Sequence, residues 1–277
     1  MMYNIKTGHR YLYLRKLYYY APQSQYANIQ LTAKAEKWMI ELEKNGVVKI
    51  ENEFNDLVEY INKEYFSGKN SPYIAKDINT QRSIEMGIMQ ATTLSLKDPR
   101  LEKLYFNDEM LAMLSKHYKR QAYYRNLPTT LTNSYDQSKH KKDMQALFHL
   151  DGGLDQISFM FLVNDLTDND THLQFSLGSN REKHKTADRY KFNQEEIEKN
   201  YPLIKCTGKA GTLFIFQAGL GFHRGFQVSG STRKILHANF TSGHDLVPQQ
   251  FDKKSDFKHI ENKAFYVKKS IDKIVTQ

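Results

Sequence analysis

The sequence Phe148-His149-Leu150-Asp151-Gly152-Gly153 begins a segment rich in candidate ligands. The sequence Gly221-Phe222-His223-Arg224-Gly225 lies toward the end of the same segment. His149 and Asp151 are two residues apart, so on an extended backbone both side chains point to the same face. His223 comes much later in the chain, beside glycines. We therefore expect two imidazoles and one carboxylate to meet on one face of a β-rich core.

These residue types indicate a metal site with open coordination positions. Two histidines and one carboxylate on one face form the ligand set of non-heme Fe(II) oxygenases. Arg233 follows His223 and carries a planar guanidinium suited to a carboxylate. A single histidine is more often structural, but His149, Asp151, His223 and Arg233 in this order form a much more specific pattern.

The chain around the motif has the pattern of successive strands with turn signals at short spacing. Residues 156–164 are the most hydrophobic run of the protein and predict a central strand buried on both faces. In the last predicted core strand, residues 233–241, alternation places Arg233, His237 and Asn239 on one face. Further strands are expected at residues 120–126, 129–135, 145–150, 172–177, 203–206 and 212–217. This spacing favours an antiparallel sandwich or barrel.

The first part of the chain predicts helices. Apolar residues follow helical spacing at 32–44, with Thr32 as the candidate N-cap and Gly46 as the stop. Other helices are expected at residues 55–66, 84–90, 107–114 and 193–201, and a short strand at 47–50. The expected fold class is mainly β with flanking helices (α+β). We expect one domain over residues 1–277, divided into a mostly helical part at 1–118, a core at 119–245 and a C-terminal extension at 246–277.

The composition is that of a globular protein with a basic surplus. The 277 residues include 40 Lys and Arg against 31 Asp and Glu, which gives a net charge of +9. A basic surface favours anionic ligands. The sequence has no block of about five or six like charges, so we do not expect nucleic acid as a partner. The single cysteine, Cys206, excludes an intrachain disulfide. No segment has the composition of a signal peptide or a membrane span, so we expect a cytoplasmic protein.

Several motifs occur in a characteristic order: residues 148–153, the apolar strand that ends in Val163-Asn164-Asp165-Leu166-Thr167, the turn Leu177-Gly178-Ser179-Asn180, the strand Gly211-Thr212-Leu213-Phe214-Ile215-Phe216, and then His223 and Arg233. This order resembles the phytanoyl-CoA dioxygenase-like branch of the Fe(II)/2-oxoglutarate-dependent oxygenases. The resemblance spans residues 145–241. It implies a double-stranded β-helix (jelly-roll, cupin-like) core that uses iron, 2-oxoglutarate and O2. It also implies hydroxylation of a small molecule, with release of succinate and CO2.

The resemblance also implies roles for individual residues. His149, Asp151 and His223 would bind iron, and Arg233 would pair with the far carboxylate of 2-oxoglutarate. Gln145 matches a polar position that lies near the cosubstrate in some relatives. No catalytic side chain is expected beyond the metal ligands.

Two positions depart from the family pattern. Asn180 stands where relatives often have histidine, and Gly225 stands where they often carry a serine or threonine that helps to hold 2-oxoglutarate. Asp151 is kept, whereas related halogenases replace this carboxylate with a small residue to make room for halide. Its presence therefore favours hydroxylation or a similar oxidation.

Four further residues are candidates for contact with the substrate because they are polar and close to the motif in sequence or in strand register: Gln174, His237, Asn239 and Arg224. For each of them a structural role is the alternative. His237 and Asn239 would then be buried polar residues with partners in the core, and Arg224 an exposed arginine.

Two classes of function stay open on the sequence. The first is an Fe(II)/2-oxoglutarate-dependent dioxygenase acting on a small molecule, with an anionic molecule favoured by the positive charge. The second is a non-catalytic cupin-like protein that binds metal or sugar. Within the enzyme class, the positive charge and the basic, tyrosine-rich residues 1–31 motivate a variant in which the substrate is linked to a carrier, lipid or glycan. Residues 1–31 suit a membrane surface, and the alternative is an arm packed on the main domain. Hydroxylation, desaturation, cyclisation and epimerisation share their first step, and the sequence does not reveal the oligomeric state.

Overall fold

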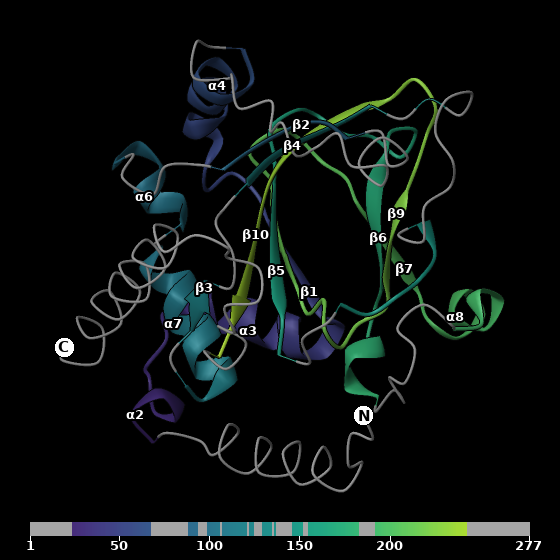
Figure 1. Ribbon diagram of the computed structural model, residues 1–277. Coiled ribbons are helices and arrows are strands. Elements are labelled where there is room, and N and C mark those ends of the chain that lie inside the picture. The colour runs from purple at the N-terminus through teal and green to yellow at the C-terminus, as the bar shows by residue number, and fades with distance from the viewer. Residues whose placement is uncertain are drawn as a thin grey trace, which may run out of the picture.

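In the computed structural model, two antiparallel sheets face each other, and helices cover the outer side of the larger sheet (Figure 1). The structure describes residues 24–67, 88–93, 99–105, 107–120, 122–124, 129–134, 136, 146–151, 155–182 and 192–242. Gln145, the first 23 residues and the predicted extension at 246–277 lie outside the described residues.

The larger sheet has seven strands within the described residues. They are β1 (Val47–Ile50), β2 (Ile88–Thr93), β3 (Tyr123–Tyr124), β4 (Thr129–Ser134), β5 (Ile157–Leu162), β8 (Leu213–Phe216) and β10 (Thr232–Thr241). Their order is β1-β8-β5-β10-β4-β2, and β3 pairs with the end of β10. The register places Met160 opposite His237 and Ser158 opposite Asn239 on the two central strands.

The smaller sheet consists of β7 (Leu203–Cys206), β6 (His172–Ser176) and β9 (His223–Phe226), in that order. An isolated antiparallel bridge adds His149 to the free edge of β9, opposite His223. The two halves of the sequence motif therefore meet at the edge of the smaller sheet, although they are far apart along the chain.

Apolar residues fill the space between the sheets and the space behind the larger sheet. Phe214, Ile235 and Phe175 belong to the cluster between the two sheets, with Phe175 contributed by the smaller one. Phe161 and Leu236 point the other way and pack with the helices. Fully burying one such phenylalanine contributes about 1.5–3 kcal/mol, so both layers matter for stability. The fold is a jelly roll whose interior is the space between the two sheets.

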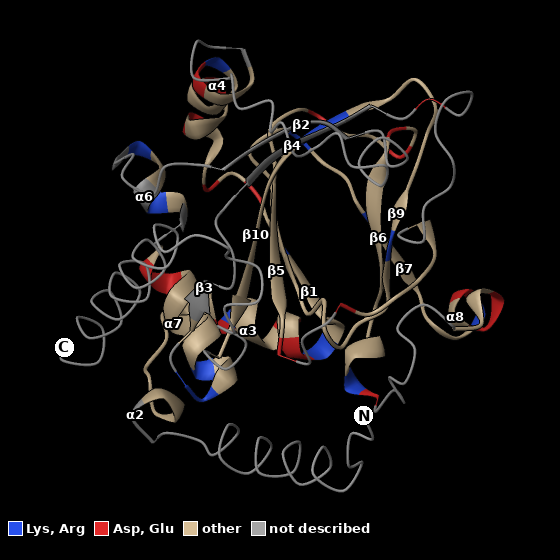
Figure 2. Cartoon of the chain, in the orientation of Figure 1, with Lys and Arg blue, Asp and Glu red and all other residues tan. Residues whose placement is uncertain are grey.

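Helices pack against the outer face of the larger sheet, and α8 lies beside the smaller sheet (Figure 1). The helices are α2 (Ser24–Ala27), α3 (Ala33–Asn45), α4 (Val58–Ile61), α6 (Pro99–Tyr105), α7 (Asp108–Tyr118) and α8 (Gln194–Asn200), with short 3-10 or π turns at Asn55–Leu57, Asn62–Ser67 and Ser179–Arg181. Charged residues gather on the helices, whereas the strands are mostly uncharged (Figure 2). Among the described residues, no helix combines the length and apolar character needed to cross a bilayer.

Helix α3 begins and ends where its sequence predicts. The Thr32 hydroxyl accepts a hydrogen bond from the amide of Ala35 at 3.2 Å, which satisfies a free donor of the first turn. Gly46 follows the helix with φ of 79°, a left-handed conformation that favours glycine. The chain then enters β1, so this turn connects a covering helix directly to the edge of the larger sheet.

The structure corrects two secondary-structure predictions. Residues 88–90 belong to strand β2, where the sequence predicted a helix over 84–90; pairing with β4 outweighs the local helical pattern. Residues 146–150 form only the bridge at His149, where a full strand was predicted. The predicted strands at 47–50, 129–135, 156–164 and 233–241 are confirmed within one or two residues at their ends. The division at residues 118 and 245 stays a prediction.

Candidate metal centre

The backbones of His149 and His223 pair with each other in both directions. The amide of His149 donates to the carbonyl of His223 at 3.0 Å, and the amide of His223 donates to the carbonyl of His149 at 3.2 Å. The centroids of the two imidazole rings are 4.4 Å apart. Because directly opposite residues on paired strands project to the same face, this bridge brings both rings to one point inside the jelly roll.

Each imidazole is held in the same way by a carbonyl two residues before it in the chain. Nδ1 of His149 lies 2.8 Å from the carbonyl oxygen of Leu147, and Nδ1 of His223 lies 3.0 Å from the carbonyl oxygen of Gly221. A carbonyl only accepts hydrogen bonds, so each Nδ1 carries the proton. Each Nε2 is thereby the nitrogen available to a metal.

Asp151 completes the group. Its amide donates to the carbonyl of Ala218 at 2.8 Å, which positions the backbone. Its Oδ1 lies 3.9 Å from Nε2 of His149 and 3.7 Å from Nε2 of His223. Two atoms that bind one metal ion at about 2.1 Å are at most about 4.2 Å apart, so these separations fit a shared ion. His149, Asp151 and His223 together present three candidate ligand atoms to one point.

The three candidate ligands differ in exposure. The imidazole side chains of the histidines are 3% and 6% exposed, whereas the Asp151 side chain is 29% exposed. The histidines are therefore shielded from solvent, and Asp151 is the most exposed of the three candidate ligands.

The charge state of Asp151 suits a metal ligand. Burial alone would raise the pKa of its carboxyl group, but the hydrogen bond and charge of His223, with the charges of His149 and His237, lower the pKa to about 2. The carboxylate is therefore ionised at neutral pH. A divalent cation at this position would find a negative ligand without removing a proton from it.

Gln156 is a member of the site that the sequence analysis missed. Its Nε2 donates to Oδ2 of Asp151, the carboxylate oxygen that does not face the histidines. The same nitrogen lies 3.5 Å from the hydroxyl of Ser158, which donates to Oδ1 of Asn239 at 2.6 Å. The signal was present in the sequence, because Gln156 and Ser158 are polar positions two apart at the start of the most apolar strand.

Strand β10 places its predicted residues on the inner face. Ile235 packs between the sheets, and alternation puts Arg233, His237 and Asn239 on the same face. Burial lowers the pKa of Arg233 to about 10, with the Cys206 thiol opposing the shift, so the guanidinium stays positive at neutral pH. Burial lowers the pKa of His237 to about 4, although Asp151 opposes the shift, so His237 is neutral at neutral pH.

Gln174 and Arg224 lie on the other face of the smaller sheet, away from the candidate metal ligands. They stand opposite each other in the β6–β9 register, next to the inward-facing pair Phe175 and His223. Nε of Arg224 donates to Oε1 of Gln174 at 2.8 Å. Arg224 also pairs with Glu198 of α8 at 2.7 Å and lies 4.2 Å from the Phe148 ring centroid. This placement gives both residues a structural task in joining α8 to the sheet, and their contact with the substrate stays a prediction.

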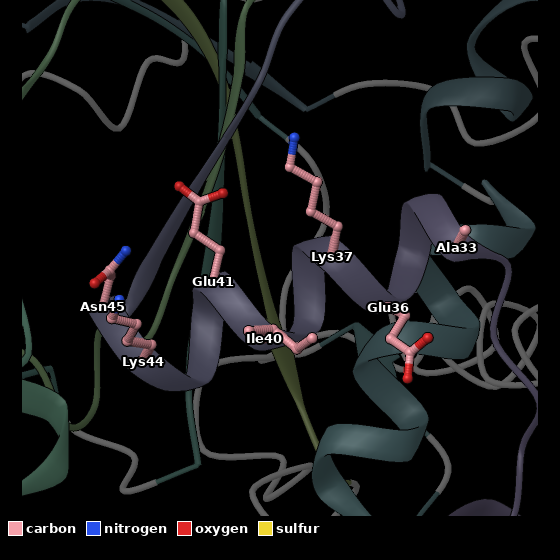
Figure 3. A pocket seen from close by; sticks show the side chains of 7 residues that line it. All are labelled: Ala33, Glu36, Lys37, Ile40, Glu41, Lys44 and Asn45. Carbon is pink, nitrogen blue, oxygen red and sulfur yellow. The ribbon is translucent and has the colours of Figure 1, made fainter.

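A shallow surface pocket lies elsewhere on the molecule. Figure 3 shows that its lining side chains, among them Ile40, Lys37 and Glu41, all belong to helix α3. Helix α3 covers the outer face of the larger sheet, on the side opposite the jelly-roll interior. The pocket is therefore separate from the metal centre.

Solved structures with a similar fold are available for comparison. EctD from S. alaskensis, in a structure with bound Fe, has a TM-score of 0.54 and 14% identity over 78% of this chain and 80% of its own. The non-heme alpha ketoglutarate dependent carbocyclase SnoK from nogalamycin biosynthesis has a TM-score of 0.53 and 11% identity over 80% and 87%. The non-heme alpha ketoglutarate dependent epimerase SnoN from the same biosynthesis has a TM-score of 0.52 and 11% identity over 76% and 83%.

The likeness to these proteins is one of fold. TM-scores of 0.52 to 0.54 show the shared fold, whereas identities of 11% to 14% leave the activity to be argued from the site. No protein-family model matches the chain, and no curated protein matches it in sequence.

Proposed function

We propose that this protein is an Fe(II)/2-oxoglutarate-dependent dioxygenase of the phytanoyl-CoA dioxygenase-like branch. The observation that carries the proposal is the convergence of Nε2 of His149, Nε2 of His223 and Oδ1 of Asp151 on one point inside a jelly roll. This donor set fits Fe(II), because two neutral imidazoles and one carboxylate leave room for further ligands. Similar solved structures of EctD, SnoK and SnoN, described as holding Fe or as alpha-ketoglutarate-dependent, support the choice.

Arg233 supports 2-oxoglutarate as the cosubstrate. Its side chain shares the inner face of β10 with Ile235, and its guanidinium stays positive at neutral pH. A planar guanidinium can hold a carboxylate through two hydrogen bonds, which would fix the far end of 2-oxoglutarate.

The protein side chains position the reactants. Fe(II) with 2-oxoglutarate and O2 supplies the oxidation that breaks an unactivated C–H bond, with succinate and CO2 as coproducts. His149, His223 and Asp151 would hold the ion, and Arg233 would orient the cosubstrate. His237 is neutral at neutral pH and lies on the same face, so it adds no charge that would compete with Arg233 for a carboxylate. Phe214, Phe175 and their neighbours keep the inner face between the sheets apolar.

We propose hydroxylation of a small molecule as the reaction. The retained Asp151 supports it, since this ligand leaves no room for halide at the same position. His237 and Asn239 are inward-facing residues that the substrate would meet, and the net charge of +9 favours an anionic molecule.

Succinate formation tests the proposal. Protein purified without oxygen, then given Fe(II), 2-oxoglutarate and air, should form succinate slowly even without the true substrate. His149→Ala should abolish the reaction, and Arg233→Ala should weaken the apparent affinity for 2-oxoglutarate. The matched controls are His117→Ala on α7 and Arg100→Ala on α6, which remove the same residue types from helices on the outer side of the larger sheet. Equal turnover in His149→Ala and the wild type would contradict the proposal.

The second candidate is a metal-binding protein without turnover. It rests on the same three ligands, but a protein without turnover would not need Arg233 to bind 2-oxoglutarate. A wild-type protein that binds metal, with no 2-oxoglutarate binding and no succinate, would support this alternative. Metal binding with 2-oxoglutarate affinity that depends on Arg233 would support the enzyme.

A further inference from the structure

The candidate metal ligands are linked to both sheets of the fold. His149 and His223 are fixed to each other by their backbone pairing at the edge of the smaller sheet. The carboxylate of Asp151 points to them with Oδ1 only. Its second oxygen, Oδ2, faces the larger sheet and accepts the hydrogen bond from Gln156.

The orientation of the Gln156 amide follows from the chemistry of its neighbours. An ionised carboxylate accepts hydrogen bonds and donates none, so the nitrogen of Gln156 must face Asp151. That nitrogen also approaches the hydroxyl oxygen of Ser158 at 3.5 Å. The Ser158 hydroxyl then donates to Asn239 at 2.6 Å. Both donors of the Gln156 amide are thus used, and the amide is anchored to strands β5 and β10.

Burial makes this arrangement costly to disturb. Gln156 is 6% exposed and Ser158 is 1% exposed. A buried donor or acceptor that loses its partner costs about 1–3 kcal/mol, and more when the partner is charged. The amide of Gln156 therefore has one favourable position, and that position holds Oδ2 of Asp151 away from the histidines.

We propose that Gln156 is a positioning residue that keeps Asp151 a one-oxygen metal ligand and joins the metal centre to the larger sheet. The inference depends on the proposed function in one respect: a metal ion must bind His149, Asp151 and His223. Without the Gln156 donor, Oδ2 would turn toward the ion and take a coordination position that a chelating cosubstrate needs. Groups that orient a metal ligand typically change metal affinity by about 10-fold to 100-fold when they are removed.

Gln156→Met tests the inference, because methionine has nearly the same length and cannot donate a hydrogen bond. Co(II) is the probe: its visible absorption reports both the affinity and the coordination of the bound ion without turnover. Loss of the donor also removes the fixed orientation of Oδ1 toward the ion, so we expect Co(II) affinity to fall about 10-fold to 100-fold. The absorption change on adding 2-oxoglutarate should also be smaller than in the wild type, because the carboxylate occupies a position of the cosubstrate.

The matched control is Gln217→Met. Gln217 is also a buried glutamine, 4% exposed, but its amide donates to the carbonyl of Leu42 at the end of α3, on the outer side of the larger sheet. Its loss should lower thermal stability and leave Co(II) affinity and spectrum as in the wild type. If Gln156 had only a structural role, Gln156→Met would also lower thermal stability and leave Co(II) affinity and spectrum unchanged.

A second variant keeps the test decisive if Gln156→Met does not fold. Ser158→Ala removes the hydroxyl that anchors the Gln156 amide and should shift Co(II) affinity in the same direction by a smaller factor. Unchanged Co(II) affinity and spectrum in whichever of these variants folds would overturn the inference while the proposed function stands. A wild-type protein that binds no Co(II) would instead overturn the proposed function, and the inference with it.

Discussion

His149 and His223 exchange two backbone hydrogen bonds, of 3.0 and 3.2 Å, across the edge of the smaller sheet. The relative position of the two imidazoles is therefore set by the main chain, and Nδ1 of each ring is held by a carbonyl two residues earlier. The Asp151 side chain, which is 29% exposed, is held by the side chain of Gln156 and not by the main chain. The metal position is in this sense prepared by the fold.

We expect a divalent metal to raise the thermal unfolding temperature of the wild type. An ion present at 100 times its dissociation constant adds about 2.7 kcal/mol to the stability of the folded state, which corresponds to a shift of about 5–10 °C for a domain of this size. Asp151→Ala should lose most of this shift, since it removes the negative ligand. Differential scanning fluorimetry with and without Co(II) measures it, with His117→Ala as the control that retains the full shift.

Arg224→Ala should destabilise the protein. Arg224 stacks on Phe148 at 4.2 Å, donates to Gln174 and pairs with Glu198 of α8. Losing these contacts should cost about 1–3 kcal/mol of unfolding free energy in urea denaturation. Replacing the exposed Lys205 by alanine, which removes a surface ion pair, should cost less than about 1 kcal/mol. Equal stability of Arg224→Ala and the wild type would restore the idea that Arg224 serves the substrate.

Cys206 should resist thiol reagents in the folded protein at pH 7 to 9. The side chain is 0% exposed, and burial raises the pKa of its thiol, so the reactive thiolate does not form in this range. Because Cys206 is the one cysteine of the chain, labelling with Ellman's reagent reports on it alone. We expect one thiol per chain to react in urea and almost none without it. Fast reaction of the native protein at pH 9 would contradict the buried position.

Gly46→Ala should be more destabilising than Gly230→Ala. Both glycines have φ near +80°, at 79° and 83°, where alanine costs about 1–2 kcal/mol. A Cβ at Gly46 would come within 2.8 Å of the Phe175 ring and of Asn180, whereas nothing lies within 4 Å of a Cβ at Gly230. The clash should add about 1–3 kcal/mol. Urea denaturation of both variants gives the difference, and equal losses would show that the Phe175 ring yields without cost.

The sequence was sufficient for the features that depend on short spacing. His149 and Asp151 share a face because they are two residues apart, and alternation along β10 correctly separated Arg233 from the core-facing Leu236. The cap of α3 at Thr32 was also recognisable, because capping depends on one side chain and the next turn.

Features that depend on strand pairing were harder to predict. Gln174 faces outward because β6 pairs with β9 in a register that places it opposite Arg224, and no local pattern reveals a register. Arg224 itself could have been excluded, since a residue next to His223 on a strand must face the other way. Gln156 reaches Asp151 through the position of β5 in the larger sheet, so its partner was beyond a local pattern. Gln145 lies outside the described residues, and its role stays a prediction.

The inner face of β10 also limits which insertions and deletions the strand can accept between Arg233 and Asn239. Arg233, His237 and Asn239 are separated by four and by two positions along β10. This strand pairs with β5 on one side and with β4 on the other. One residue inserted between Arg233 and Asn239 would send one of them to the helix side of the sheet. Descendants of this sequence can therefore lengthen or shorten the interval only in pairs of residues, or by a bulge that absorbs the odd one. An even change in length keeps Arg233, His237 and Asn239 on one face of the sheet, and an odd change does not.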